Sequence, residues 1–147
     1  MPPMFGGTAS QHHPWMKSRY PAIRKDADGK MLCRGCGGDV PKGRQTWCSR
    51  ICYDTHCPQQ VILKVKQRDL GICQLCAAQT LGAPNGHLRR ILKMDWLDIR
   101  RTLPKAHFDH VVPFSEGGPT TLENLRTLCI PCHKERTKQW HKERVKR

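Results

Sequence analysis

Apolar residues are sparse along this chain and fall in short stretches separated by glycine, proline and charged residues. The stretch from Pro58 to Asp69 has apolar and charged residues on mixed faces, and Gly71 follows it closely. This pattern predicts a helix that ends before the glycine. A second helix is expected from about residue 86 to residue 101, because five apolar residues recur there at helical spacing: Leu88, Ile91, Leu92, Trp96 and Ile99.

The segment that follows the second helix predicts a strand and then a turn. Residues 106–112 form a short run that ends in two valines, and Pro113 closes it. The turn residues are Glu116-Gly-Gly-Pro. A hairpin return is expected near residues 120–121, leading into Leu122-Glu-Asn-Leu.

The two ends of the chain show different patterns. Pro131 suits the first position of a helix, which should cover residues 132–146. Residues 1–30 contain proline, glycine, histidine and scattered charge without apolar periodicity. We expect them to form a flexible basic arm that orders partly near Trp15 and Tyr20. Helices together with strands place the chain in the α+β class.

Nine cysteines bear on both the stability and the location of the protein. Hydrophobic residues make up 37% and aromatic residues 6% of the sequence, which is lean for a chain that must bury a sizeable core. No apolar run is long enough to span a membrane, and the N-terminus lacks a charged-then-apolar signal pattern, so we expect an intracellular location. Paired cysteines more often bind zinc than form disulfides there. The odd count also argues against a fully paired disulfide framework.

The first cysteine set predicts a structural zinc site. Its first pair, Cys33 and Cys36, lies in a glycine-rich turn, which suits a zinc knuckle. Its second pair, Cys48 and Cys52, suits the start of a helix. Four thiolates from a knuckle and a helix N-terminus form a closed tetrahedral site. Cys57 is then a leftover thiol, although Cys57 or His56 could replace Cys52 as the fourth ligand. The four cysteines of this set are Cys33, Cys36, Cys48 and Cys52.

The second set consists of two knuckles about fifty residues apart: Cys73, Cys76, Cys129 and Cys132. One zinc between them would close a long loop and should stabilise the fold. Sulfur fills all four positions, so this zinc is structural rather than catalytic. We therefore expect a four-cysteine module at residues 31–57, followed by a zinc-stapled domain at residues 58–147.

Residues between and beside these knuckles suit phosphodiester hydrolysis, which needs an activated water and stabilised phosphoryl charge. Asp109 offers an oxygen ligand and His133 a nitrogen ligand for one divalent ion that stays open to water and substrate. His110 is the candidate general base. Because neighbouring strand side chains point to opposite sides, Asp109 and His110 reach one phosphate only at a strand end or bend. Asn124 cannot take a proton, but its amide can fix backbone groups around His110.

Other residues of this region have less specific interpretations. His107 shares a strand face with Asp109, and it is either an additional ligand for metal or phosphate or a residue that simply packs there. Glu116 is interpreted as a turn residue, Trp140 as a packing residue and His141 as a surface residue.

A formal net charge of +14 narrows the choice of partner. The chain stays strongly basic even when eight thiolates bind two zinc dications, and this excess of cations indicates nucleic acid rather than a membrane. No base-reading code is visible, so sequence preference is not predicted. The candidate phosphate contacts form two groups, which are Lys134, Arg136 and Lys138 in the final helix and Arg89, Arg90 and Lys93 in the second helix.

Taken together, these motifs resemble the HNH family of nucleases. The family's elements occur in order over about residues 58–147, and they are specific. They are the two cysteine pairs, Asp109-His-Val-Val-Pro, Glu116-Gly-Gly, Leu122-Glu-Asn-Leu and Leu128-Cys-x-x-Cys-His-Lys. The chain has no Walker A sequence, so it resembles stand-alone bacterial or phage members of that family.

The resemblance implies a ββα-metal fold in which His110 is the base and Asn124 orients it. Asp109 and His133 would bind the catalytic ion, for which we expect Mg²⁺ or Mn²⁺. The implied activity is that of a DNA endonuclease that leaves a 5′ phosphate. Two alternatives stay open: a zinc-stapled nucleic-acid-binding adaptor that does not cut, and a nuclease directed at RNA.

Overall fold

The computed structural model describes residues 19–147, which are divided between two compact units at Gln60 and Val61. The predicted arm before residue 19, including Trp15, lies outside the described residues. None of the helices in the described part of the chain is both long and apolar enough to cross a membrane.

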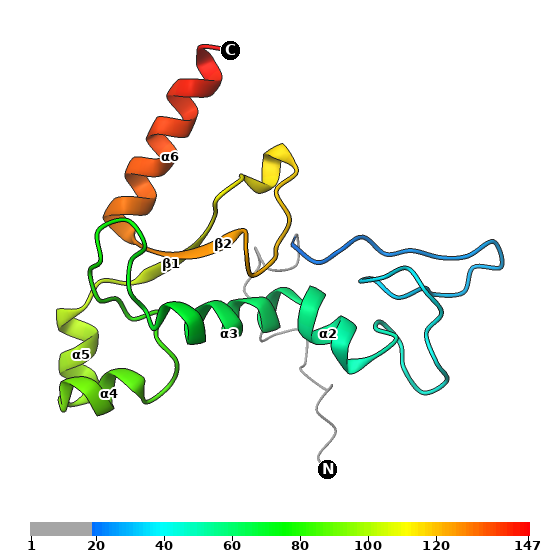
Figure 1. Ribbon diagram of the computed structural model, residues 1–147, viewed down its shortest axis with the longest axis horizontal. Coiled ribbons are helices and arrows are strands. Elements are labelled where there is room, and N and C mark those ends of the chain that lie inside the picture. The colour runs from blue at the N-terminus through cyan, green and yellow to red at the C-terminus, as the bar shows by residue number, and fades with distance from the viewer. Residues whose placement is uncertain (1–18) are drawn as a thin grey trace. The chain divides into compact units, whose positions relative to one another are not determined.

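The first unit consists of loops followed by a helix (Figure 1), and it contains the first cysteine set. An isolated β-bridge between Leu32 and Asp39 closes the turn that carries the first cysteine pair, and helix α2 (Arg50–His56) follows the next cysteine. The hydroxyl of Ser49 caps α2 by accepting the Cys52 N–H at 3.2 Å. The buried core of this unit is small and partly made of cysteine: Cys33, Val40, Trp47 and Cys57.

Helix α3 (Pro58–Asp69) crosses the division, and the second unit continues with two short helices, a strand pair and a long helix. The two strands run antiparallel, with Ala106 opposite Cys129 and His110 opposite Leu125. The long helix follows the second strand directly, which confirms the α+β class with a ββα arrangement. The elements after α3 are α4 (His87–Leu92), α5 (Trp96–Thr102), β1 (Ala106–His110), β2 (Leu125–Cys129) and α6 (Ile130–Val145).

The two faces of the strand pair have different neighbours. Because side chains alternate along a strand, Asp109 and Arg126 lie on the face toward α6. Phe108 and Thr127 lie on the opposite face, toward α3, where Lys66 lies 5.9 Å from the Phe108 ring centre. The strand pair thus separates a packing face from the face that carries the candidate metal ligands.

The single helix expected over residues 86–101 is wrong, because α4 and α5 are separate helices. Lys93 adopts a left-handed backbone conformation, with φ of 51°, and its N–H closes α4 on the Arg89 carbonyl. Asp95 then caps α5, since its carboxylate accepts the Leu97 N–H at 3.0 Å. The C-terminal cap of α4 at Lys93 and the N-terminal cap of α5 at Asp95 lie two positions apart, and together they divide the predicted helix into two.

This break also changes what the second helix was expected to bury. Of the five apolar residues at helical spacing, Leu88 and Ile99 enter a core with Ala83. The other three side chains are more exposed: Ile91 by 47%, Leu92 by 36% and Trp96 by 44%.

The strand boundaries also differ from those expected. β1 ends at His110 rather than at residue 112, and β2 begins at Leu125 rather than near residues 120–121. Residues 111–124 form a longer loop that contains a 3₁₀ turn, η2 (Phe114–Glu116). The strands are not joined by a tight hairpin turn. Hydrogen bonds from the side chain of Asn124 close the loop instead. The final helix begins at Ile130, two residues earlier than expected.

Candidate active site and zinc centres

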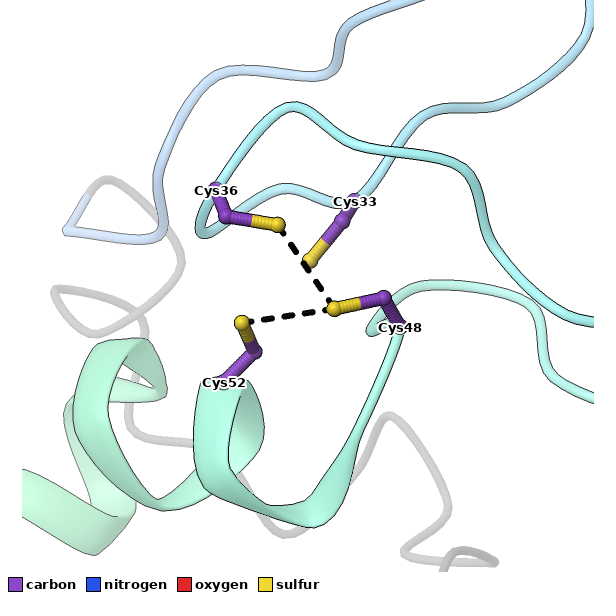
Figure 2. A group of neighbouring side chains, drawn as sticks. All are labelled: Cys33, Cys36, Cys48 and Cys52. Atoms are coloured by element: carbon purple, nitrogen blue, oxygen red, sulfur yellow. Dashed lines mark hydrogen bonds between the residues drawn. The ribbon is translucent and has the colours of Figure 1, made fainter.

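The sulfur atoms of the first cysteine set converge on a single point (Figure 2). All four Sγ atoms lie within 4.8 Å of one another, and those of Cys36 and Cys52 lie 3.6 and 3.4 Å from that of Cys48. Zinc bonds of about 2.3 Å place tetrahedral sulfurs about 3.8 Å apart, so the set fits a structural zinc. Cys57 is a buried free thiol, and neither Cys57 nor His56 belongs to this set.

Two thiols in each cluster have pKa values shifted in opposite directions. Burial raises the pKa of Cys33 and of Cys73, but backbone hydrogen bonds outweigh burial and lower each pKa to about 6. Hydrogen bonds to a neighbouring thiol raise the pKa of Cys52 and of Cys132 to about 12. A zinc dication bound at either cluster would favour the thiolate form of its ligands.

The second cysteine set joins the knuckle after α3 to the junction of β2 and α6. Its Sγ atoms also lie within 4.8 Å of one another, with 3.7 Å between those of Cys76 and Cys129. Cys129 is the last residue of β2, and Cys132 lies in the first turn of α6. A zinc ion at this point would fix the helix that carries His133 against the strand.

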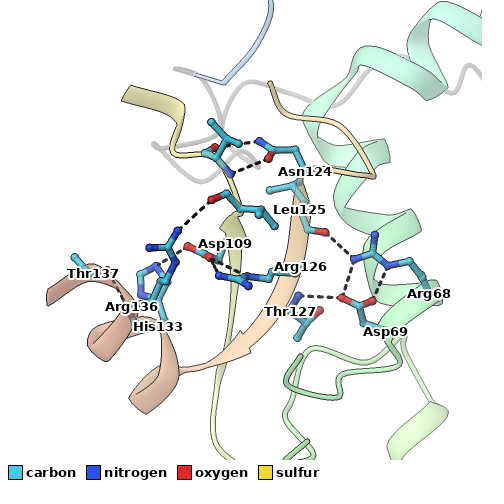
Figure 3. A network of polar contacts seen from close by, with 12 residues as sticks. Arg68, Asp69, Asp109, Asn124, Leu125, Arg126, Thr127, His133, Arg136 and Thr137 are labelled. Atoms are coloured by element: carbon cyan, nitrogen blue, oxygen red, sulfur yellow. Dashed lines mark hydrogen bonds and ion pairs between the residues drawn. The ribbon is translucent and has the colours of Figure 1, made fainter. Parts of the chain in front are cut away.

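Asp109 lies near the end of β1, on the face toward His133 of α6 (Figure 3). Its Oδ2 accepts hydrogen bonds from Nε and Nη2 of Arg126, both at 3.1 Å, and Arg126 is its direct partner in the strand register. Its Oδ1 lies 3.9 Å from Nε2 of His133. Two atoms that bind one divalent ion with bonds of about 2.0–2.2 Å lie roughly 3.0–3.5 Å apart at ordinary coordination angles, so a shift of about half an ångström would let both bind the same ion.

His107 packs against the ring of His133 beside the pair formed by Asp109 and His133. Its ring centre lies 4.5 Å from that of His133, with the planes tilted by 40°. Burial lowers the pKa of His107, and His133 lowers it further, although Asp109 opposes the shift. Within residues 19–147 the two cysteine sets are the groups of three or more converging metal-ligating side chains. His107 thus contacts the ring of one proposed ligand, and its role as a ligand or as a packing residue stays a prediction.

His110 is the last residue of β1, where the chain leaves the strand. Its Nε2 lies 3.0 Å from Oγ1 of Thr120, and its ring meets the edge of Phe114 at 5.8 Å between centres. His110 and Asp109 thus lie at a strand end, which is the position that two adjacent residues need in order to serve one site.

The loop after His110 is closed by Asn124. Its Oδ1 accepts the Val112 N–H at 2.9 Å, and its Nδ2 donates to the carbonyls of Val112 at 3.1 Å and Pro119 at 2.8 Å. The backbone carbonyl of Asn124 accepts the Val111 N–H at 2.8 Å. Glycine is required at position 118, because a Cβ there would collide with the Val112 carbonyl.

The last two residues of α3 hold the start of β2 from the opposite face (Figure 3). Arg68 donates to the carbonyls of Leu122 at 2.6 Å and Leu125 at 2.7 Å. The carboxylate of Asp69 pairs with Arg68 and accepts the Thr127 N–H at 2.9 Å. These hydrogen bonds fix the segment that carries Asn124.

Two side chains of α6 reach the loop from its other side. Arg136 donates to the Val111 carbonyl at 3.2 Å, and Nε1 of Trp140 donates to Glu116 at 2.9 Å. Glu116 is therefore an acceptor for α6 as well as a turn residue. The remaining predicted phosphate contacts stay predictions, and all are exposed: Lys134, Lys138, Arg89, Arg90 and Lys93.

Sequence reasoning missed three residues of this site. Arg126 is one cation among 26 in the chain, and only the strand register places it opposite Asp109. Thr120 carried no signal, because the loop was expected to be shorter. Arg68 reaches a carbonyl 57 positions later in the chain, a contact that depends on tertiary packing.

The second unit is thus a ββα domain with a four-cysteine cluster that fits zinc at the junction of β2 and α6. Residues 96–139, which cover β1, β2 and the first part of α6, match the HNH endonuclease family. The chain therefore contains an HNH endonuclease domain, the catalytic domain of a class of phosphodiester hydrolases.

Several curated proteins are also similar to parts of the chain. The DNA annealing helicase and endonuclease ZRANB3 of Mus musculus is 34% identical over 138 residues, which cover 74% of this chain and 13% of that protein. The Homo sapiens ZRANB3 is 33% identical over 128 residues, which cover 67% and 12%. Anaredoxin of Nostoc sp. is 40% identical over 42 residues, which cover 29% and 50%. The chain thus spans about an eighth of the length of the ZRANB3 proteins. No solved structure matches it.

Proposed function

We propose that this protein is a metal-dependent DNA endonuclease whose centre consists of Asp109, His110, Asn124 and His133. The observation that carries the proposal is the 3.9 Å separation of Asp109 Oδ1 and His133 Nε2, beside the strand end that presents His110. A protein that only binds nucleic acid has no need of this set. The match of residues 96–139 to the HNH endonuclease family supports the same conclusion.

Asp109 and His133 would hold the catalytic ion, with Mg²⁺ or Mn²⁺ as the expected occupant. When bound, such an ion stabilises charge on the phosphoryl oxygens and on the leaving 3′ oxygen. Arg126 holds Oδ2 of Asp109 and so leaves Oδ1 directed toward His133. Arg126 is in this proposal a positioning residue for the carboxylate.

His110 takes a proton from the attacking water, because a neutral imidazole is a competent base near pH 7. Water then adds to phosphorus, the bond from phosphorus to the 3′ oxygen breaks, and the product carries a 5′ phosphate. Asn124 holds Val112, two residues after the base, and so fixes the direction in which the chain leaves His110. The amide does not titrate, so this support is the same at every working pH.

DNA is the substrate that we propose, for two reasons. The chain has a formal net charge of +14, and two exposed lysines of α6, Lys134 and Lys138, lie in the helix that carries His133. The names of the similar ZRANB3 proteins describe DNA annealing and endonuclease activities, which supports DNA over RNA. Structural zinc in the second cysteine set would be needed to hold the helix that carries His133 against β2.

A competition assay tests this proposal. Zinc-loaded protein is incubated with an equal mixture of labelled duplex DNA, single-stranded DNA and RNA, with Mg²⁺, with Mn²⁺ or with a chelator. We expect cleavage of DNA that needs the divalent ion and leaves ends that ligate without prior phosphorylation. Preferential cleavage of RNA would overturn the choice of substrate. Binding without cleavage of any nucleic acid would instead identify an adaptor.

A further inference from the structure

The junction of α4 and α5 exposes five large apolar side chains that lie outside the neighbouring core of Ala83, Leu88 and Ile99. Only Leu88 and Ile99 of this helix pair enter the core beside it. A concentrated exposed apolar surface of this kind marks a contact site rather than ordinary surface. We name this surface the apolar tip, and its members are exposed by 36–57%: Ile91, Leu92, Met94, Trp96 and Leu97.

Cations surround the apolar tip. Of the two acidic residues in the same segment, Asp95 is committed to capping α5 and Asp98 lies in its first turn. The local charge is therefore positive, and a partner that complements it carries negative charge together with an apolar surface. The basic residues of the two helices are all exposed: Arg89, Arg90, Lys93, Arg100 and Arg101.

We propose that the apolar tip binds unstacked bases of DNA while the surrounding Arg and Lys side chains hold the adjacent phosphates. An intact duplex presents phosphates but hides its base faces, so it leaves a cluster of apolar side chains without a partner. Unpaired or unstacked bases offer those faces, and aromatic side chains among cations bind them by stacking. Trp96, exposed by 44% at the start of α5, is the stacking residue.

The apolar tip is separate from the site of cleavage. Figure 1 shows α4 and α5 near the beginning of β1, whereas His110 ends that strand. This inference rests on the proposed function for the identity of the polymer and deepens it, because it makes DNA with a locally unpaired segment the preferred substrate.

Binding measurements test the proposal without depending on cleavage. The full chain, zinc-loaded and without Mg²⁺ or Mn²⁺, is titrated with a perfect duplex and with the same duplex carrying a bubble of unpaired bases. The protein variants are Trp96→Ala, Leu97→Ser, which removes a second apolar side chain of the tip, and Val145→Ala as a matched control. Val145 is 88% exposed and lies at the far end of α6, outside the apolar tip. Zinc content and circular dichroism verify that each variant is folded.

We expect the wild type to bind the bubble duplex more tightly than the perfect duplex. Trp96→Ala should lower affinity for the bubble duplex about fivefold or more, the factor that one stacked base supplies, and change affinity for the perfect duplex less than about twofold. Leu97→Ser should act in the same direction, and Val145→Ala should change neither affinity. Equal affinity of the wild type for both duplexes, or equal losses on both in folded Trp96→Ala protein, would overturn the proposal. Because binding is measured without the catalytic ion, a failure of cleavage and a failure of base binding give different results.

Discussion

The carboxamide of Asn124 is hydrogen-bonded to both backbone polar groups of Val112. Oδ1 accepts the Val112 N–H at 2.9 Å, and Nδ2 donates to the Val112 carbonyl at 3.1 Å. A neighbouring strand normally supplies such a pair of bonds, but β2 begins only after Asn124. One uncharged side chain therefore holds the backbone that leaves His110, and it does so without affecting the charge of the site.

Asn124→Ala is expected to lower the rate of DNA cleavage about a hundredfold or more, because a general base contributes that much only when it is positioned. Stability should fall by about 1–3 kcal/mol, since the substitution leaves the N–H and carbonyl of Val112 without their partners. Cleavage kinetics and urea unfolding measure the two effects. Asn124→Asp is the informative companion, because it keeps the acceptor for the Val112 N–H and loses the donor. If both variants cleave DNA at the wild-type rate, Asn124 has no role in positioning the base.

The buried carboxylate of Asp69 predicts a pH dependence of stability. Burial raises the pKa of Asp69, but hydrogen bonds from Arg68 and the Thr127 N–H outweigh burial, and the net pKa lies below its ordinary value. Such a group stabilises the fold above its unfolded pKa of about 3.9, and this stability is lost as the pH falls through the lower folded pKa. Asp69→Asn should therefore cost about 1.5–3 kcal/mol at pH 7, the contribution of a charged hydrogen bond.

The difference in unfolding free energy between wild type and Asp69→Asn should shrink as the pH falls below about 4. Loss of zinc at acid pH destabilises both proteins and cancels in the difference. A difference that stays constant from pH 7 to pH 3 would mean that Asp69 acts through its shape and not its charge.

Zinc content separates the cysteines that bind metal from the one that does not. Cys129→Ser should reduce the bound zinc from two ions per chain to one and lower stability, because the clamp between β2 and α6 is lost. Cys57→Ser should retain two ions, since Cys57 belongs to neither cluster. Elemental analysis after gel filtration gives both counts. One ion or none in Cys57→Ser would show that the first cluster is assigned wrongly.

The lysines of α6 should contribute to affinity through phosphates alone. Substituting Lys134 and Lys138 together by Ala is expected to weaken DNA binding uniformly across sequences and to reduce the slope of log affinity against log salt by about 2. Val145→Ala should leave the slope unchanged. Fluorescence anisotropy at several salt concentrations measures it. An unchanged slope in the lysine variant would place the DNA elsewhere on the protein.

Local chemistry made the cysteine clusters predictable from the sequence. Each knuckle closes its own turn, as when the Ala77 N–H bonds the Cys73 carbonyl, so the ligand spacing alone identifies the site. Pro131 indicated the start of α6 for the same reason, because its effect on the backbone is local. The apolar spacing through residues 86–101, in contrast, continued across a break that Lys93 and the Asp95 cap impose.

Contacts between distant segments were not predictable in this way. The pairing of Asp109 with Arg126 depends on the strand register, and that register depends on a loop longer than expected. The hydrogen bonds from Arg68 to the Leu122 and Leu125 carbonyls depend on how α3 packs against β2. The sequence identified the residues of the proposed chemistry, whereas the residues that position them required the structure.

Cleavage of supercoiled plasmid by wild type and His110→Ala tests the central claim most directly. Both proteins are assayed with Mg²⁺, with Mn²⁺ and with chelator, and DNA binding is followed in parallel by gel shift. The account predicts ion-dependent cutting by the wild type and its loss in His110→Ala, with binding and zinc content retained. Equal cutting by the two proteins would contradict the assignment of His110 as the base, and binding without any cutting by the wild type would contradict the proposal of an endonuclease.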